Sequence, residues 1–266
     1  MNMSIYAIGD VHGRADLLGA LISAIENHEE SDVDQKIFIF LGDIVDRGSD
    51  SRGAMDLVLR TIKRYPRSKL ILGNHDFLFR QFAKGQMAEP AYLGWLFTQG
   101  GKQTIESYLP VLPTRVDDIL DGLEMFHDHF SLLDEAVDSI SMGGFCFVHA
   151  GIRPGVSLAD QNEHDLRWIR DEFLEFPEPF EKIIVHGHTP VNGVHPEFRP
   201  NRIAVDTGAH ETGSLSAVVI NNDEAVGFLR AWSFGDEHPQ TEFVSRVSIT
   251  AGDVEREMVR NCPRPF

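Results

Sequence analysis

Cysteine is scarce in this sequence of 266 residues, which contains Cys146 and Cys262 and no others. Two cysteines are too few for the disulfide framework that stabilises small secreted domains, so we expect the protein in a reducing cytoplasm. Cys146 lies within an apolar run, where a buried and unreactive thiol is expected.

Long apolar runs are also missing from the sequence. No run approaches the roughly 18 residues that a membrane-spanning helix requires. Residues 1–8 lead directly into a short apolar segment, without the basic stretch and long apolar stretch of a secretory signal. No run rich in proline, glycine or serine suggests a linker. We therefore expect a soluble, unprocessed chain that does not bind membranes and folds as one domain over residues 1–266.

Positive charge is in short supply, because 24 Lys and Arg residues stand against 41 Asp and Glu residues, for a formal net charge of -17. A broad electrostatic grip on nucleic acid is therefore not expected, and a nuclease is disfavoured. A small anionic substrate would need positive charge concentrated at one point. Two divalent cations and a few arginines would supply that charge, whatever the sign of the remaining surface.

The sequence does contain a repeated order of segments near its start. Three short apolar runs, at residues 4–8, 37–41 and 69–72, each end in a Gly-Asp or Gly-Asn pair, and amphipathic helical patterns follow. This order is typical of β-α-β units, in which ligand sites gather beyond the carboxyl ends of the strands. The sequence therefore predicts an α/β fold whose polar clusters converge in one crevice.

The remaining chain divides into a helical segment, further strands and a tail. Residues 77–134 are predicted to be mostly helical and to form a cap, with Trp95 and Phe97 in the core and His129 at a solvated position. The segment 235–266 is polar and weakly patterned, and we expect a tail there. Strand patterns resume after the cap, at residues 139–140, 145–148, 183–185, 203–205, 215–220 and 225–232.

Five polar clusters follow five of the predicted strands. The first contains Asp10 and His12, a carboxylate and an imidazole that could bind one metal ion from a single turn. By itself this pair is equally compatible with a helix-capping turn, because Asp10 stands where an N-cap residue belongs. The other clusters are Gly42-Asp43-Ile44-Val45-Asp46-Arg47-Gly48, Gly73-Asn74-His75-Asp76, His149-Ala150-Gly151 and His186-Gly187-His188-Thr189.

The order of these motifs resembles that of the phosphoprotein phosphatases, a calcineurin-like metallophosphoesterase family. The matching patterns are Gly-Asp-x-His-Gly, Gly-Asp-x-x-Asp-Arg-Gly, Gly-Asn-His, His-Ala-Gly and Gly-His-Thr, and the resemblance covers residues 4–232. It is closer to the compact bacterial and phage serine/threonine protein phosphatases than to the longer eukaryotic ones. The resemblance implies two packed mixed β-sheets flanked by helices, and metal-dependent hydrolysis of a phosphate ester.

The same resemblance implies that two divalent metal ions bind to six side chains. Mixed oxygen and nitrogen ligands suit manganese first, with iron or zinc as alternatives, better than calcium. Two cations would stabilise a bridging hydroxide that attacks phosphorus in line. The implied ligands are Asp10 and His12 for one metal, Asn74, His149 and His188 for the other, and Asp43 as the bridge between them.

The catalytic roles are implied in the same way. His75 is the candidate general acid for the leaving oxygen, and Asp46 would orient and charge-stabilise it. Arg47 matches the family's first phosphate-clamping arginine. Arg170 is the candidate second arginine, with Arg167 as the fallback.

Two further histidines have simpler interpretations. His186 stands two residues before His188, but the family pattern places the ligand after glycine. We therefore expect His186 to lie at the strand end or to contact the ligands without binding a metal ion itself. His210 lies in a glycine-rich segment that resembles a family loop near the active site. An exposed loop histidine is expected there, with substrate contact as the alternative.

The sequence favours one of two substrate classes. Asp76 follows His75 where many protein phosphatases of the family carry glutamate, and the similar symmetrical diadenosine tetraphosphate hydrolases commonly have aspartate. However, those hydrolases tend to replace the acid found here as Asp46, and the segment Trp168-Ile169-Arg170 also resembles the protein phosphatases. We therefore expect a serine/threonine phosphatase acting on a phosphorylated protein, peptide or small phosphate ester. The alternatives are a dinucleoside polyphosphate hydrolase and a catalytically silent metal-binding regulator.

Overall fold

The computed structural model describes residues 3–28, 35–109, 111, 113–235 and 237–249. The helices are α1 (Ala15–Asn27), α2 (Ser51–Arg64), α3 (Asn74–Ala83), α4 (Glu89–Thr98), α5 (Gly101–Tyr108), α6 (Val116–Leu123), the 3-10 helix η2 (Glu124–Phe126), α7 (His127–Asp134), α8 (Glu163–Trp168), α9 (Asp171–Leu174) and α10 (Ala209–Thr212). The strands are β1 (Ser4–Ile8), β2 (Lys36–Phe40), β3 (Lys69–Leu70), β4 (Ser139–Met142), β5 (Phe145–Val148), β6 (Ile183–His186), β7 (Glu197–Phe198), β8 (Arg202–Ala204), β9 (Ser214–Asn221), β10 (Glu224–Trp232) and β11 (Gln240–Ile249).

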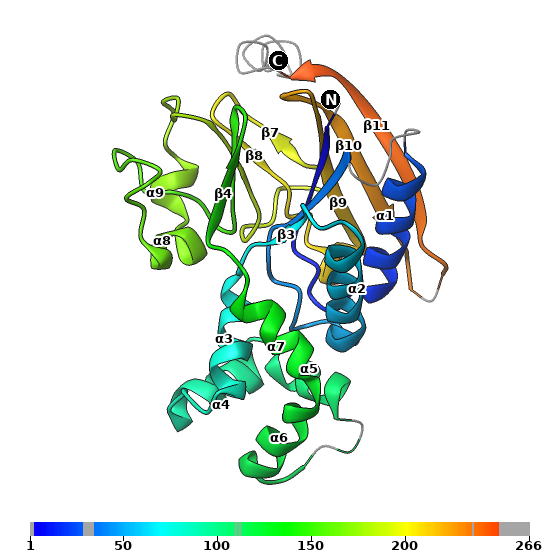
Figure 1. The fold of residues 1–266 in the computed structure, drawn as a ribbon, viewed down its shortest axis with the longest axis vertical. Coiled ribbons are helices and arrows are strands. Elements are labelled where there is room, and N and C mark those ends of the chain that lie inside the picture. Colours follow the sequence, from blue (N-terminus) through cyan, green and yellow to red (C-terminus); the bar gives the residue numbers. More distant parts are fainter. Residues whose placement is uncertain (1–2, 29–34, 110, 112, 236, 250–266) are drawn as a thin grey trace, which may run out of the picture.

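Two mixed β-sheets pack face to face, and helices cover their outer sides (Figure 1). Within the described residues, one sheet has the strand order β11-β10-β9-β1-β2-β3 and the other has the order β4-β5-β6-β8-β7. Strands β1, β2 and β3 run parallel to one another, as do β5, β6 and β8. The predicted α/β fold with two packed mixed sheets is thereby confirmed.

Burial on both faces explains why β1 is apolar after its first residue, Ser4. Ile5 and Ala7 point into the core between the two sheets, whereas Tyr6 and Ile8 pack under α1 and α2 on the outer side. Successive side chains of a strand point to opposite faces, so a strand covered on both faces has no polar positions. Strand β2 follows the same rule, and the pair forms the rigid centre of the first sheet.

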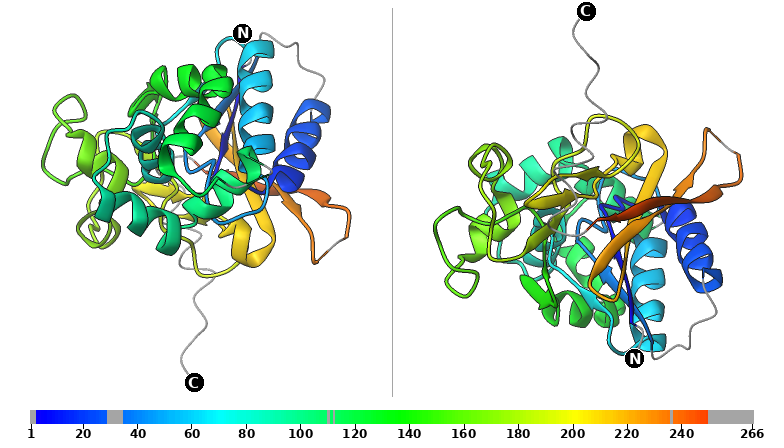
Figure 2. Two further views of the ribbon diagram at one scale, coloured as in Figure 1. Left: turned by 90° about the horizontal axis from the view of Figure 1, so that it is seen from below. Right: turned by 90° about the horizontal axis from the view of Figure 1, so that it is seen from above.

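The helices α3 to α7 lie together at one end of the molecule (Figures 1 and 2). This helical segment begins at Asn74, earlier than the expected residue 77. Trp95 is fully buried, as expected, but the expectation for Phe97 is wrong, because its side chain is 70% exposed. His129 is buried rather than solvated, and its ring lies between the hydroxyl of Tyr108 at 2.8 Å and Asp56 at 3.1 Å. None of the helices in the described part of the chain is both long and apolar enough to span a bilayer.

The expectation of an unpatterned tail is wrong for residues 240–249, which form β11. This strand pairs antiparallel with β10, with Leu229 opposite Phe243 and Phe228 opposite Val244. An edge strand needs few apolar side chains, because backbone hydrogen bonds to its neighbour supply much of its stability, so its hydrophobic pattern is weak. Residues 250–266, including Cys262, lie outside the described residues.

Candidate metal centre

The polar clusters converge where the carboxyl ends of the parallel strands meet. Two groups of possible metal ligands occur among the described residues, and they share Asp43. In the first group, Oδ2 of Asp43 lies 3.7 Å from Nε2 of His12. In the second group, the same oxygen lies 3.4 Å from Nε2 of His149, with His188 beside it. One carboxylate oxygen therefore faces an imidazole on each side.

The other two expected ligands lie at the same place. Oδ1 of Asn74 is 3.0 Å from Nε2 of His149 and 2.9 Å from Nδ1 of His188. Both carboxylate oxygens of Asp10 accept the backbone N–H of His188 at 3.1 Å. The structure thus brings together the six side chains that the sequence suggested as ligands, from loops after β1, β2, β3, β5 and β6.

This donor set fits divalent cations. The carbonyl oxygen of Asn74 faces two imidazole nitrogens at once, and Nε2 of His188 is buried without a hydrogen-bond partner among the described residues. Burial, together with the nearby carboxylate of Asp206, raises the pKa of Asp10 well above its ordinary value. Concentrated positive charge would keep such a buried carboxylate ionised, and neutral imidazole, amide and carboxylate groups are ordinary metal ligands.

The backbone around these side chains is strained in a consistent way. Five non-glycine residues of the clusters have positive φ angles, in the left-handed region that side chains with a Cβ disfavour. Such conformations cost on the order of 1–3 kcal/mol each and are kept where the surrounding structure determines them. The residues are His12 at 46°, Asp43 at 51°, Asp46 at 74°, Arg47 at 68° and His188 at 65°.

Two glycines of the motifs are required by close approach. A Cβ atom at Gly187 would lie 2.0 Å from Oδ1 of Asp10, and one at Gly73 would lie 2.2 Å from Oδ1 of Asp43. Non-bonded atoms do not approach to these distances, so any side chain at either position would displace a carboxylate. The glycines next to His188 and Asn74 therefore leave room for the acids that face them.

His75 is held by a buried acid. Its Nδ1 lies 2.7 Å from Oδ2 of Asp46, which also accepts the indole N–H of Trp95 at 2.7 Å. The hydroxyl of Thr104 donates to Oδ1 of Asp46 at 2.7 Å. Burial lowers the pKa of His75, but the carboxylates of Asp43 and Asp46 outweigh it and raise this pKa above its ordinary value. Both carboxylates therefore favour the protonated imidazole.

The arginines take different positions. Nη2 of Arg47 donates to Nε2 of His75 at 3.2 Å, so the guanidinium and the imidazole are in direct contact. Arg170 is exposed between α8 and α9, and its charge helps to lower the pKa of His188, which burial lowers most, to about 3. Arg167 is buried, forms ion pairs with Asp138 and Glu163, and has its guanidinium over the ring of Phe77. Arg167 is therefore engaged by other groups, and Arg170 stays the prediction for the second arginine.

The expectations for the two further histidines meet different outcomes. His186 is fully buried, its ring packs against Phe173 at 5.0 Å, and burial lowers its pKa to about 3. The expectation of an exposed His210 is wrong. Its side chain is only 16% exposed, and its ring lies 5.2 Å from the ring of His12.

Two further acids lie in the site: Asp206, which nothing in the sequence separates from an ordinary turn residue, and Asp76, which the sequence connects only with the choice of substrate. Asp206 is buried beside Asp10 and accepts the N–H of Gly208 at 2.9 Å, and burial raises its pKa to about 6. Oδ1 of Asp76 accepts the backbone N–H groups of Ile44 at 2.9 Å and Val45 at 3.3 Å. Asp76 therefore supports the loop that carries Asp43 through its backbone.

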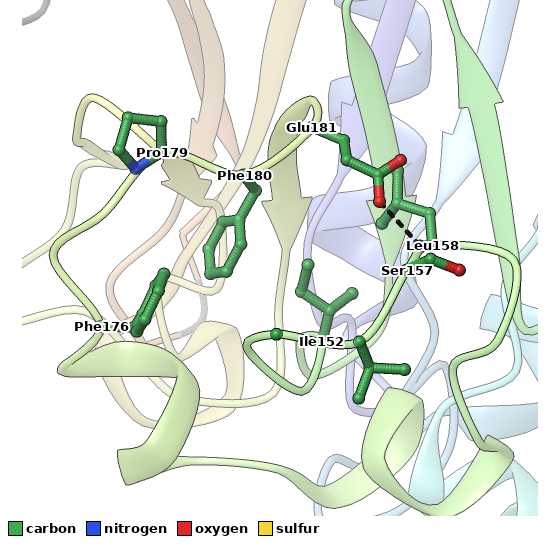
Figure 3. Close-up of a pocket in the computed structure, with 9 residues that line it drawn as sticks. Ile152, Ser157, Leu158, Phe176, Pro179, Phe180 and Glu181 are labelled. Carbon is green, nitrogen blue, oxygen red and sulfur yellow. Dashed lines mark hydrogen bonds between the residues drawn. The ribbon is translucent and has the colours of Figure 1, made fainter.

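A cavity elsewhere on the surface has different chemistry. It measures about 440 Å³ and lies between the loops that follow β5 and precede β6 (Figure 3). Phe176, Phe180 and Ile152 line it, and Glu181 accepts the N–H of Leu158 at 3.3 Å. None of the proposed metal ligands lines this cavity, and its apolar wall with one carboxylate does not suit a phosphate.

Comparison with known proteins supports the metal centre. A family model described as calcineurin-like phosphoesterase matches residues 3–240. The symmetrical bis(5'-nucleosyl)-tetraphosphatase of Legionella pneumophila (strain Corby) is 44% identical over 75 residues, or 28% of this chain and 24% of that protein. The chain thus matches about a quarter of the length of this relative. The asymmetrical bis(5'-nucleosyl)-tetraphosphatase PrpE of Geobacillus thermodenitrificans is 24% identical over 238 residues, or 81% of this chain and 90% of that protein.

A solved structure agrees with the fold. A mutant of a cold-active protein tyrosine phosphatase superposes with a TM-score of 0.59 at 17% identity, over 91% of this chain and 80% of that one. At this identity the similarity shows the arrangement of the sheets and helices.

The shared position of Asp43 makes a prediction about metal content. Asp43→Asn should lower the number of bound metal ions measured by mass spectrometry of the dialysed protein, because it removes a charged oxygen that faces both ligand groups. Asp128→Asn, at a half-exposed acid on α7, is the control and should bind as much metal as the wild type. Full metal content in Asp43→Asn would contradict the bridging role.

The contact between Trp95 and Asp46 makes a second prediction. Trp95→Phe keeps an aromatic ring but removes the N–H donor to a buried carboxylate, so the free energy of unfolding should fall by roughly 1–3 kcal/mol in urea titrations. The rate should fall most for phosphate esters with poor leaving groups, because Asp46 acts through His75. A rate loss that is equal for all leaving groups would show that Trp95 does not act through Asp46 and His75.

Proposed function

Because this chain belongs to the calcineurin-like phosphoesterase family, a class of metal-dependent phosphoester hydrolases, we propose that it is a two-metal phosphomonoesterase acting on phosphoserine and phosphothreonine residues of proteins. The observation that carries the two-metal proposal is the position of Asp43. One oxygen of this side chain faces His12 on one side and His149 on the other. A carboxylate that bridges two ions would take this position, which supports the two-metal proposal.

Six residues would hold the metals in this proposal. His12 and Asp10 would bind one ion, Asn74, His149 and His188 the other, and Asp43 both. The mixed nitrogen and oxygen donors suit manganese, iron or zinc. When bound, such ions supply an activated water molecule and neutralise charge on the phosphate.

The chain's own residues bind and orient the phosphate. Arg47 has a planar guanidinium that can donate two parallel hydrogen bonds to phosphate oxygens. Arg170, which is exposed between α8 and α9, is the proposed second donor to the phosphate. The left-handed backbone of Arg47 is fixed by its N–H, which donates to the carbonyl of Gly100 at 3.3 Å.

His75 would donate a proton to the leaving oxygen. Asp46 accepts the Nδ1–H of His75, so the ring's Nε2 is directed toward Arg47, where the phosphate would bind. A positioned acid of this kind contributes on the order of 10²- to 10⁴-fold to the rate. The three side chains that hold Asp46 are His75, Trp95 and Thr104.

This acid favours phosphoserine and phosphothreonine as substrates. The leaving oxygen of such an ester becomes a strongly basic alkoxide, which needs a proton as the bond to phosphorus breaks. A nucleotide leaving from a dinucleoside polyphosphate is a much weaker base and gains less from an acid. The buried and fully hydrogen-bonded His75–Asp46 pair is therefore best explained by a poor leaving group.

A dinucleoside polyphosphate hydrolase is the second candidate. The names of the Legionella and Geobacillus relatives favour it. Asp76, which the sequence connects with those hydrolases, contacts the backbone of Ile44 and Val45 and does not face the metal ligands with its hydrogen-bonded oxygen. The presence of Asp76 is therefore not a reason to prefer a dinucleotide.

Turnover on three substrates separates the candidates. Purified protein with manganese is expected to hydrolyse a phosphoserine peptide with a higher kcat/KM than diadenosine tetraphosphate, with p-nitrophenyl phosphate as the reference for metal-dependent activity. A preference for the dinucleotide would replace the first proposal with the second candidate. Silence on all three substrates, with metal shown to be bound, would indicate a metal-binding regulatory protein.

The role of His75 makes a further prediction. His75→Asn should lower kcat strongly for the phosphoserine peptide and much less for p-nitrophenyl phosphate, because nitrophenolate leaves without protonation. The comparison is a plot of log kcat against the pKa of the leaving group for both proteins, in which the variant should have the steeper slope. Parallel lines would remove His75 from the acid role.

A further inference from the structure

A second cavity adjoins the metal centre on the side of His12. It measures about 410 Å³, and its lining includes Arg14, Ser49, His210, Glu211 and Phe234. These residues come from the start of α1, the loop after Arg47, α10 and the segment after β10. We call it the α10 pocket, and its size is within the range of sites for small organic ligands.

Histidine rings connect the α10 pocket with the reaction centre. The ring of His210 packs against His12 at 5.2 Å, and the ring of His12 packs against His75 at 4.8 Å. His210 and the general acid therefore flank the same metal ligand. Nδ1 of His210 is buried without a hydrogen-bond partner among the described residues.

Hydrogen bonds hold the walls of the α10 pocket together in the absence of a ligand. Arg14 joins three of its walls, because it donates to the carbonyl of Ala209 at 3.0 Å, to Ser233 at 3.3 Å and to Asp16 at 2.7 Å. The hydroxyl of Thr212, the last residue of α10, donates to the carbonyl of Thr207 at 2.7 Å and ties this helix to the segment that precedes it. A cavity whose walls are tied together in this way loses little freedom when a ligand binds.

An exposed aromatic ring stands at the edge of this polar pocket. Phe234 is 65% exposed, although a phenylalanine gains by burial. The other residues named above offer a guanidinium, hydroxyls, an imidazole and a carboxylate. An aromatic face beside such groups suits a ligand with a planar ring and a polar connecting part.

We propose that the α10 pocket is a subsite for the leaving group, in which Phe234 stacks on a planar aromatic ring that a short polar spacer joins to the reacting phosphate. This inference rests on the proposed phosphoesterase function. The ring could belong to a nucleoside or to an aromatic residue beside a phosphoserine. Both present the same chemistry to Phe234, and matched substrates tell them apart.

The test uses pairs of substrates with the same leaving oxygen. Adenosine 5'-monophosphate and ribose 5-phosphate differ by the base, and two phosphoserine peptides differ by tryptophan or alanine at a neighbouring position. The wild type should hydrolyse the aromatic member of at least one pair with the higher kcat/KM. Phe234→Ala should lower kcat/KM for that member roughly tenfold and leave the non-aromatic member unchanged, because stacking on one ring is lost.

Phe97→Ala is the matched control, because Phe97 is a similarly exposed phenylalanine on α4 that does not line the pocket. This variant should change neither pair. Equal rates for both members of each pair in the wild type would overturn the proposal, and so would an equal loss on both members in Phe234→Ala. The pair that responds identifies the source of the ring.

A binding experiment keeps this test independent of turnover. Saturation-transfer NMR with adenosine, which has no phosphate, should give a signal with the wild type that Phe234→Ala loses and ribose does not give. If the protein hydrolysed none of the phosphate esters, the proposed function would be wrong. The binding result would still show whether the α10 pocket binds an aromatic ring. The absence of a signal from both adenosine and tryptophan amide with the wild type would contradict the proposed aromatic subsite.

Discussion

The contact of one Asp43 oxygen with His12 and His149 is the constraint on which the rest of the site depends. His12 follows β1 of the first sheet, and His149 follows β5 of the second, so this carboxylate joins the two halves of the fold. Its other oxygen accepts the N–H of His75 at 2.9 Å, which also ties the helix carrying the candidate acid to the same group. Burial raises the pKa of Asp43, but His149 and His75 outweigh it and hold this pKa well below its ordinary value. The acid that joins the sheets therefore favours its ionised form among these imidazoles.

Keeping this arrangement requires backbone conformations that the chain would not adopt alone. The left-handed residues His12, Asp43 and His188 direct their side chains inward from three different loops. Each such residue costs stability, and the apolar core between the sheets offsets the cost because it fixes the strand ends from which the loops start. Asp76 contributes by accepting backbone N–H groups of the Asp43 loop. The buried core thus stabilises the sheets, and the sheets hold the strained loops and their polar side chains in place.

The sequence predicts those features of the fold and of the site that leave a pattern in neighbouring residues. Apolar runs ending in Gly-Asp or Gly-Asn mark the strands and the five clusters, so the fold class and the convergence of Asp10, Asn74 and His188 could be anticipated. Contacts between distant segments left no such mark. Trp95 was expected only as a core residue, and nothing in α4 indicates that its indole donates to Asp46. His210 and Asp206 stand in a glycine-rich segment whose path depends on the second sheet. The sequence does not predict strand β11, because Phe243 and Val244 are adjacent and two polar residues follow them, which breaks the apolar alternation on which strand prediction relies.

Substrate choice depends on two parts of the site with different demands. In the proposed reaction, the His75–Asp46 pair would respond to the basicity of the leaving oxygen, whereas the α10 pocket would respond to the organic group attached to it. A hydrolase of phosphoanhydrides would gain little from burying Asp46 under three side-chain donors, because its leaving groups are already weak bases. An aromatic edge at Phe234 is useful to either substrate class. The acid is therefore the part that discriminates between the classes, and it is the stronger reason to place a phosphomonoester of an alcohol in this site.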